Sequence, residues 1–160
     1  MALAEVSIDE RLAREASEAR RQEWLTLCRE LVAAWSELPR EDAHTLRITL
    51  LDRAFGLALL DEAGRELVFV SVTFEALAEH LDEYVDIVRQ IAREDASAGV
   101  LRLEALDMAK KVVHDRAGRM LKKACREMGV DLEGARRLFS LLVSLRIDTT
   151  RLVGIHGHRL

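Results

Sequence analysis

The chain has 160 residues, of which 49% are hydrophobic, 32% are charged and 4% are aromatic. This composition is typical of one soluble globular domain and argues against a disordered chain. No run of about 18 apolar residues occurs, and acidic residues appear from Glu5 onward, so the sequence predicts neither a membrane span nor a signal peptide. We therefore expect a single cytoplasmic domain over residues 1–160, rich in helix because proline occurs once and aromatic residues are few.

Residues 8 to about 37 are predicted to form one long amphipathic helix. Apolar residues recur along it at steps of three or four: Leu12, Ala16, Ala19, Trp24, Leu27, Cys28, Leu31 and Trp35. Asp9 is a suitable N-cap, and Pro39 ends the helix because the residue before a proline is pushed out of helical geometry. The first half of this helix has few large apolar residues, so we expect it to project from the body.

Three strand-like runs follow, at residues 45–51, 54–60 and 66–72. Leu46, Ile48 and Leu50 alternate with polar residues in the first run, as in a half-buried strand. Short connections join the three runs, and the second connection is a turn at residues 61–64. Such tight connections favour an antiparallel meander.

Three helices are predicted after the strands, at residues 74–92, 100–128 and 132–147. Thr73 and Asp131 are good N-caps for the first and the last of them, and Gly129 is a natural residue to end the second. Residues 148–160 are expected to form a flexible tail. The predicted fold class is α+β, with an N-terminal helix, a three-stranded antiparallel meander and three C-terminal helices packed on the sheet.

Metal and cofactor sites are not indicated by the cysteines and histidines. Cys28 and Cys125 stand far apart without a disulfide or zinc spacing, so we expect both to be small buried residues. His114 lies about 10 Å along its helix from Asp107, too far to share an ion with that carboxylate. His80 lies among acidic residues and is expected to be solvated. The sequence therefore predicts no metal and no cofactor.

Several polar residues of the helix at 100–128 lie on one side at helical spacing. They include Glu104, Asp107, Lys111 and His114. Opposite charges four residues apart, as at Asp107 and Lys111, are the ordinary decoration of an exposed helix, so a solvated face is the simpler interpretation. The other interpretation is a binding site.

The runs RLEALDMAKKVVHD and GARRLFSLL resemble the most characteristic part of the bacterial uncharacterised protein family 0262. The family's pattern of Glu, Asp, Met, a basic pair and His falls on Glu104, Asp107, Met108, Lys110, Lys111 and His114. Its second block falls on Asp131 and residues 135–139. The resemblance covers about two thirds of the chain, is densest over residues 101–142, and matches the N-terminal helix less well.

Departures from the family pattern indicate a divergent relative. Ala109 and Ala117 stand where the family tends to have glycine, and Asp115 stands where it has asparagine. The family has no established activity to transfer. What the resemblance implies is a set of candidate binding residues: Glu104, Asp107, Lys110, Lys111, His114, Arg136 and Arg137.

Nucleic-acid binding is not favoured, although residues 125–131 imitate the turn of a helix-turn-helix. The helix at 132–147 is apolar nearly all round, and a recognition helix must instead show polar side chains to base edges. Phe139 is the single aromatic residue in 100–160, and RNA-binding surfaces need several for stacking.

The favoured hypothesis is a non-catalytic adaptor or regulatory protein that acts through protein–protein contacts as a homodimer. A three-stranded sheet leaves free edges, and the last helix has more apolar surface than one small layer needs. No Ser, Cys or His lies in a recognisable nucleophile arrangement, so an enzyme is the less favoured interpretation. The N-terminal helix and the face from Glu104 to His114 are the candidate surfaces.

The alternative hypothesis is a small-anion or nucleotide-binding protein that uses a basic helix face. Residues 100–160 hold 13 Lys and Arg against 7 Asp and Glu, whereas residues 1–99 hold 11 against 21. A basic half can attract an anion, and Arg136 and Arg137 lie near a helix N-terminus, but the two halves can equally neutralise each other, with one arginine paired to Glu133 or to the preceding helix. Anion binding predicts ligand-dependent thermal stabilisation that is lost in Lys111→Ala or Arg137→Ala.

Overall fold

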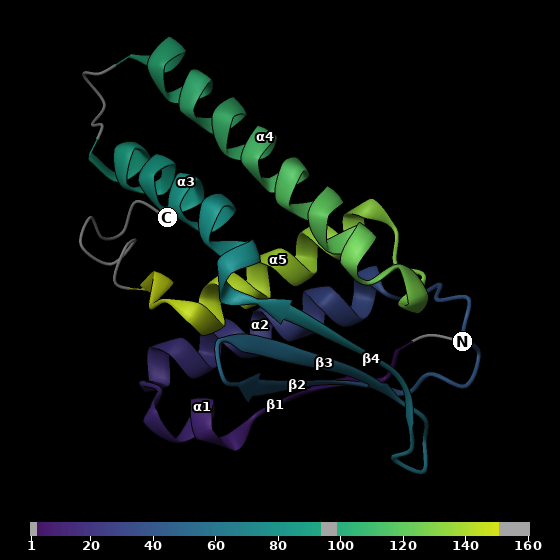
Figure 1. Ribbon diagram of the computed structural model, residues 1–160. Helices are drawn as coiled ribbons and strands as arrows, with labels where there is room; N and C mark the ends of the chain where they lie inside the picture. The colour runs from purple at the N-terminus through teal and green to yellow at the C-terminus, as the bar shows by residue number, and fades with distance from the viewer. Residues whose placement is uncertain (1–2, 94–98, 151–160) are drawn as a thin grey trace.

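The computed structural model describes residues 3–93 and 99–150 and shows a sheet with helices covering one face (Figure 1). The strands are β1 (Glu5–Ile8), β2 (Thr45–Leu51), β3 (Ala54–Leu60) and β4 (Glu66–Thr73). The helices are α1 (Glu10–Glu15), α2 (Glu18–Ala34), α3 (Phe74–Arg93), α4 (Val100–Ala124) and α5 (Leu132–Arg146), with a short 3-10 turn at Arg126–Met128. The α+β class predicted from the sequence is confirmed.

The sheet is four-stranded and mixed, in the order β1-β2-β3-β4. The three antiparallel strands lie where the sequence predicts them, and alternate residues such as Ile48, Leu57 and Val72 point into the core. The prediction of a purely antiparallel three-stranded sheet is wrong, because β1 pairs parallel to β2 with Glu5 opposite Thr45.

The prediction of one helix over residues 8–37 is also wrong. The chain leaves β1 at Ile8, and Asp9 caps α1 by accepting a hydrogen bond from the backbone N–H of Arg11 at 3.0 Å. Ala16 is extended, and Ser17 begins α2 by accepting from the N–H of Arg20 at 3.2 Å. Two capping side chains therefore divide a segment whose apolar spacing alone looks continuous.

The N-terminal helices lie against the body and do not project from it. Trp24 of α2 and Trp35, the C-cap residue of the same helix, are almost fully buried. Their indole N–H groups donate to the backbone carbonyls of Ser144, at 3.2 Å, and Gly134, at 3.0 Å. These two bonds join α2 to α5 along most of its length, because a buried indole N–H must find an acceptor.

Helix α5 lies at the centre of the core, among α2, α4 and the sheet (Figure 1). Its buried residues are Gly134, Ala135, Leu138, Phe139, Leu141, Leu142, Val143, Ser144 and Leu145. Burying one such leucine or phenylalanine stabilises the fold by about 1.5–3 kcal/mol. The apolar surface of α5 is therefore covered within one chain, and it gives no reason of its own to expect a dimer.

Gly129 makes the turn between α4 and α5 possible. Its φ of 76° is in the left-handed region that glycine adopts without strain. A Cβ at this position would also overlap the ring of Pro39. Position 129 therefore excludes a side chain for two reasons, one local and one from packing.

We expect Gly129→Ala to lower the free energy of unfolding by more than ~2 kcal/mol, with about 1 kcal/mol from the left-handed backbone and the rest from the overlap with Pro39. Gly64→Ala is the matched control, because Gly64 has φ 85° and nothing lies within 4 Å of its Cβ position. Urea unfolding of both variants measures the difference. Equal losses would show that the chain relieves the overlap at Pro39.

Candidate functional site

Helix α4 forms an antiparallel pair with α3, and its two halves have different surroundings (Figure 1). The C-terminal half packs on α5 through Val113, Ala117 and Leu121, all of which are buried. The N-terminal half extends beyond the layer of α5 and lies beside α3. The candidate binding residues of α4 are therefore divided between two environments.

His114 lies at the junction of α3, α4 and α5 and is about half-buried, not on a solvated face. Its ring stacks on Tyr84 with centroids 5.9 Å apart and meets Phe139 edge to face at 5.5 Å. Its Nε2 lies 2.8 Å from Ser140 Oγ. The Ser140 hydroxyl donates to the carbonyl of Arg136, so we infer that it accepts from a protonated Nε2 of a neutral ring.

The surroundings of His114 keep its imidazole uncharged at neutral pH. Burial, together with the positive charges of Arg136, Lys110 and Arg137, lowers its pKa from 6.5 to about 4, and burial is the largest cause. An uncharged imidazole offers no positive charge to an anion. The contacts of His114 instead join three helices.

We expect the protein to lose stability as the pH falls through the range set by His114. The folded-state pKa is about 4 and the unfolded value is 6.5, so the unfolded chain binds more protons between these two limits and stability falls as the pH drops from 6.5 to 4. The loss should be about 1–2 kcal/mol, because partial exposure of the ring screens part of the effect.

The control for this pH dependence is His114→Asn, which keeps a polar group near Ser140 and does not titrate. Urea unfolding of both proteins at several pH values should give curves that diverge below pH 6.5. Parallel curves would show that the ring protonates freely in the folded state.

The other candidates on α4 do not converge with His114. Glu104, Asp107 and Lys111 are exposed, and Lys110 places its Nζ 6.0 Å from the centre of the Tyr84 ring.

At the N-terminal end of α5, Arg136 and Arg137 are held by carboxylates. The ion pairs are Arg136 Nε–Asp115 at 3.2 Å, Arg136–Glu133 at 3.5 Å, Arg137 Nε–Glu133 at 2.9 Å and Arg137–Glu30 at 3.1 Å.

The sequence left two interpretations of the arginines open, anion binding and pairing with nearby carboxylates, and these ion pairs match the second. Arg136 pairs with Asp115 of the preceding helix, and both arginines pair with Glu133. An anion would have to compete with three carboxylates for the two guanidinium groups, so the structure adds no support for anion binding, which stays a prediction.

His80 is buried, with 9% of its surface exposed, so the expectation of a solvated side chain is wrong. It lies three residues after the buried Leu77 and therefore on the inner face of α3. The acidic neighbours in sequence suggested exposure, but the spacing from Leu77 would have placed it correctly.

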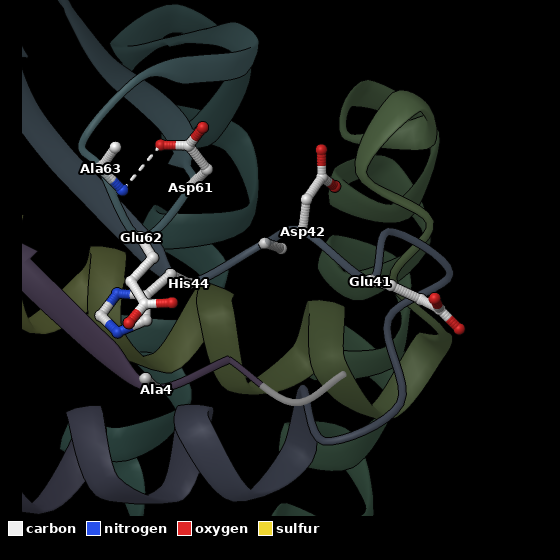
Figure 2. Close-up of a pocket in the computed structure, with 8 residues that line it drawn as sticks. Ala4, Glu41, Asp42, His44, Asp61, Glu62 and Ala63 are labelled. Carbon is white, nitrogen blue, oxygen red and sulfur yellow. Dashed lines mark hydrogen bonds between the residues drawn. The ribbon is translucent and has the colours of Figure 1, made fainter.

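A cavity of about 400 Å³ opens at one end of the sheet, between the starts of β1 and β2 and the β3–β4 turn (Figure 2). Four acidic residues line it, and Figure 2 shows Glu41 and Asp42 pointing away from His44. Asp61 accepts from the backbone N–H groups of Ala63 at 3.0 Å and Arg65 at 2.8 Å, and backbone bonding from Arg65 lowers its pKa. These contacts stabilise a turn.

No metal site accompanies this cavity. Within residues 3–93 and 99–150, no three His, Cys, Asp or Glu side chains are grouped so that they could hold an ion.

The most unusual surface of α4 is apolar, and the sequence reasoning missed it. Leu101, Met108 and Val112 are exposed by 82%, 61% and 48%, and Ala105 lies exposed between them. These four residues form a line along the helix, named here the α4 stripe. Their spacing of four, three and four residues is the sequence signal that predicts such a stripe.

Proteins similar to this chain are found in bacteria. A model of the uncharacterised protein family UPF0262 matches residues 1–148. A UPF0262 protein of Xanthobacter autotrophicus is 25% identical over 108 residues, which are 67% of this chain and 66% of that protein. A UPF0262 protein of Brucella anthropi is 24% identical over 148 residues, which are 89% of this chain and 92% of that protein. No solved structure matches.

The match over residues 1–148 includes the N-terminal region. That region was expected to match the family less well, and the family model corrects this expectation. In the part of the chain that the structure describes, no helix is long and apolar enough to cross a membrane.

Proposed function

The chain belongs to the uncharacterised protein family UPF0262, and we propose that it is a non-catalytic cytoplasmic adaptor or regulatory protein whose binding surface is the α4 stripe. The observation that supports this proposal is the exposure of Leu101, Met108 and Val112 in one line on one helix. Contiguous exposed apolar residues bordered by charges are typical of protein-binding surfaces.

The position of the stripe also supports a contact with a partner. It lies on the half of α4 that extends past α5, where a partner meets little obstruction (Figure 1). Glu104 and Lys111 border it and are exposed. An apolar centre with a charged border is the usual composition of a helix face that packs against another helix.

The sequence suggested two candidate surfaces, the N-terminal helix and the Glu104–His114 face of α4, and we favour the one on α4. Trp24 and Leu31 of α2 and the C-cap residue Trp35 are buried in the core, and Leu25 is the one large apolar residue of α2 that is clearly exposed. Helix α1 contains no buried residue and has no comparable line of large apolar side chains. We therefore keep the Glu104–His114 segment as the proposed contact surface, and we propose that its exposed apolar residues make the main contacts.

We expect a photo-crosslinking amino acid at position 108, introduced in the native cells, to give a discrete protein adduct. The control position is 18, because Glu18 is exposed on α2, away from the stripe. Irradiated cells are analysed by immunoblot and mass spectrometry. Adducts from position 108 and none from position 18 support the proposal. A failure to crosslink at 108, or the same adducts from both positions, would contradict it.

A further inference from the structure

The geometry of the α4 stripe is that of a helix-pairing seam. Leu101, Ala105, Met108 and Val112 follow the spacing of four, three and four residues that keeps one line of side chains against a second helix. The seam is about 17 Å long at 1.5 Å per residue. The next two positions in this spacing are Asp115 and Arg119, so the seam ends with Val112.

Two opposite charges border the same side of the seam. Glu104 precedes Ala105 by one residue, and Lys111 follows Met108 by three. Both are exposed, and neither forms an ion pair with a residue of the described chain. If a second α4 lies antiparallel on the seam, Leu101 meets Val112, Ala105 meets Met108, and Glu104 of each copy lies beside Lys111 of the other.

Charge distinguishes this arrangement from the parallel one. In a parallel pair, a residue on one border of the seam lies beside the residue five positions later on the second helix. Lys111 would therefore lie beside Arg116 of the second copy. Like charges at such positions weaken a helix pair, whereas the antiparallel arrangement gives two opposite-charge contacts related by a two-fold axis.

The fold leaves room for the antiparallel arrangement. The body of the molecule lies at the C-terminal end of α4, where Val113, Ala117 and Leu121 are buried, and the seam occupies the other half. Antiparallel pairing places the two bodies at opposite ends of the paired helices. A parallel pair would bring both bodies to the same end.

We propose that the α4 stripe binds a second copy of this chain, with the two α4 helices antiparallel, so that the partner in the proposed function is the chain itself. The inference rests on that proposed function and names its occupant. A seam of three helical turns offers less contact area than a standard interface of about 800 Å² per partner, so the dimer should be weak and reversible.

Sedimentation of the purified 160-residue chain between ~5 and ~500 µM should show a monomer–dimer equilibrium, as expected for a small interface. Met108→Glu should leave a monomer across this range, with an unchanged circular dichroism spectrum because Met108 is exposed. Glu18→Lys, a charge change away from the seam, should dimerise as the parent does.

Charge reversal tests the antiparallel register. Glu104→Lys and Lys111→Glu should each weaken self-association about tenfold, because each replaces two attractive contacts by two repulsive ones. An equimolar mixture of the two variants should dimerise again, since one copy then has two lysines at the seam and the other has two glutamates. The double variant Glu104→Lys/Lys111→Glu should likewise recover the parent affinity.

A monomer at all concentrations would overturn the inference, and so would variants that dimerise as well as the parent or a mixture that fails to recover. The crosslinking at position 108 then separates the two proposals. An adduct with a different protein would leave the proposed function standing without the self-association. An adduct with twice the mass of the chain, identified by mass spectrometry as two copies of it, supports both.

Discussion

Helix α5 is apolar around most of its circumference, and the need to cover this surface determines how the other elements are arranged. Nine of its 15 residues are buried. The sheet covers part of this surface, α2 covers another part through Trp24 and Trp35, and the C-terminal half of α4 covers a third. Apolar surface of α5 that stayed in water would not contribute to stability. Each neighbouring element is therefore held in place by the apolar area that it buries against α5.

Close packing on α5 explains residues that looked functional in the sequence. Gly118 of α4 lets α5 approach, since a Cβ there would lie 2.7 Å from Cγ of Arg136. His114 and Ser140 form a polar contact across the same pair of helices. Arg136 and Arg137 are held by carboxylates around the start of α5. A histidine and two arginines therefore have a structural use here, which is sufficient to account for their positions.

The surface left for function follows from a difference in length. Helix α4 has 25 residues and α5 has 15, or about 37 Å against about 22 Å, so α5 can cover only part of α4. The half beyond α5 lies beside α3, and its outer surface has polar residues together with Leu101, Met108 and Val112, which a purely solvated helix would not need. The C-terminal half of α4 therefore serves the stability of the fold, and the other half has the surface that we propose for interaction.

Local patterns in the sequence were sufficient for the strands at 45–51 and 54–60, for the caps Asp9, Thr73 and Asp131, and for the apolar character of α5. These features depend on neighbours within a few residues, and alternation or capping chemistry reports them directly. Strand β1 could not be found in this way, because four residues acquire strand structure by pairing with β2, forty positions away. The burial of His114 likewise depends on which helices pack against α4, a choice made by the tertiary structure, since packing is decided by surfaces far apart in the chain.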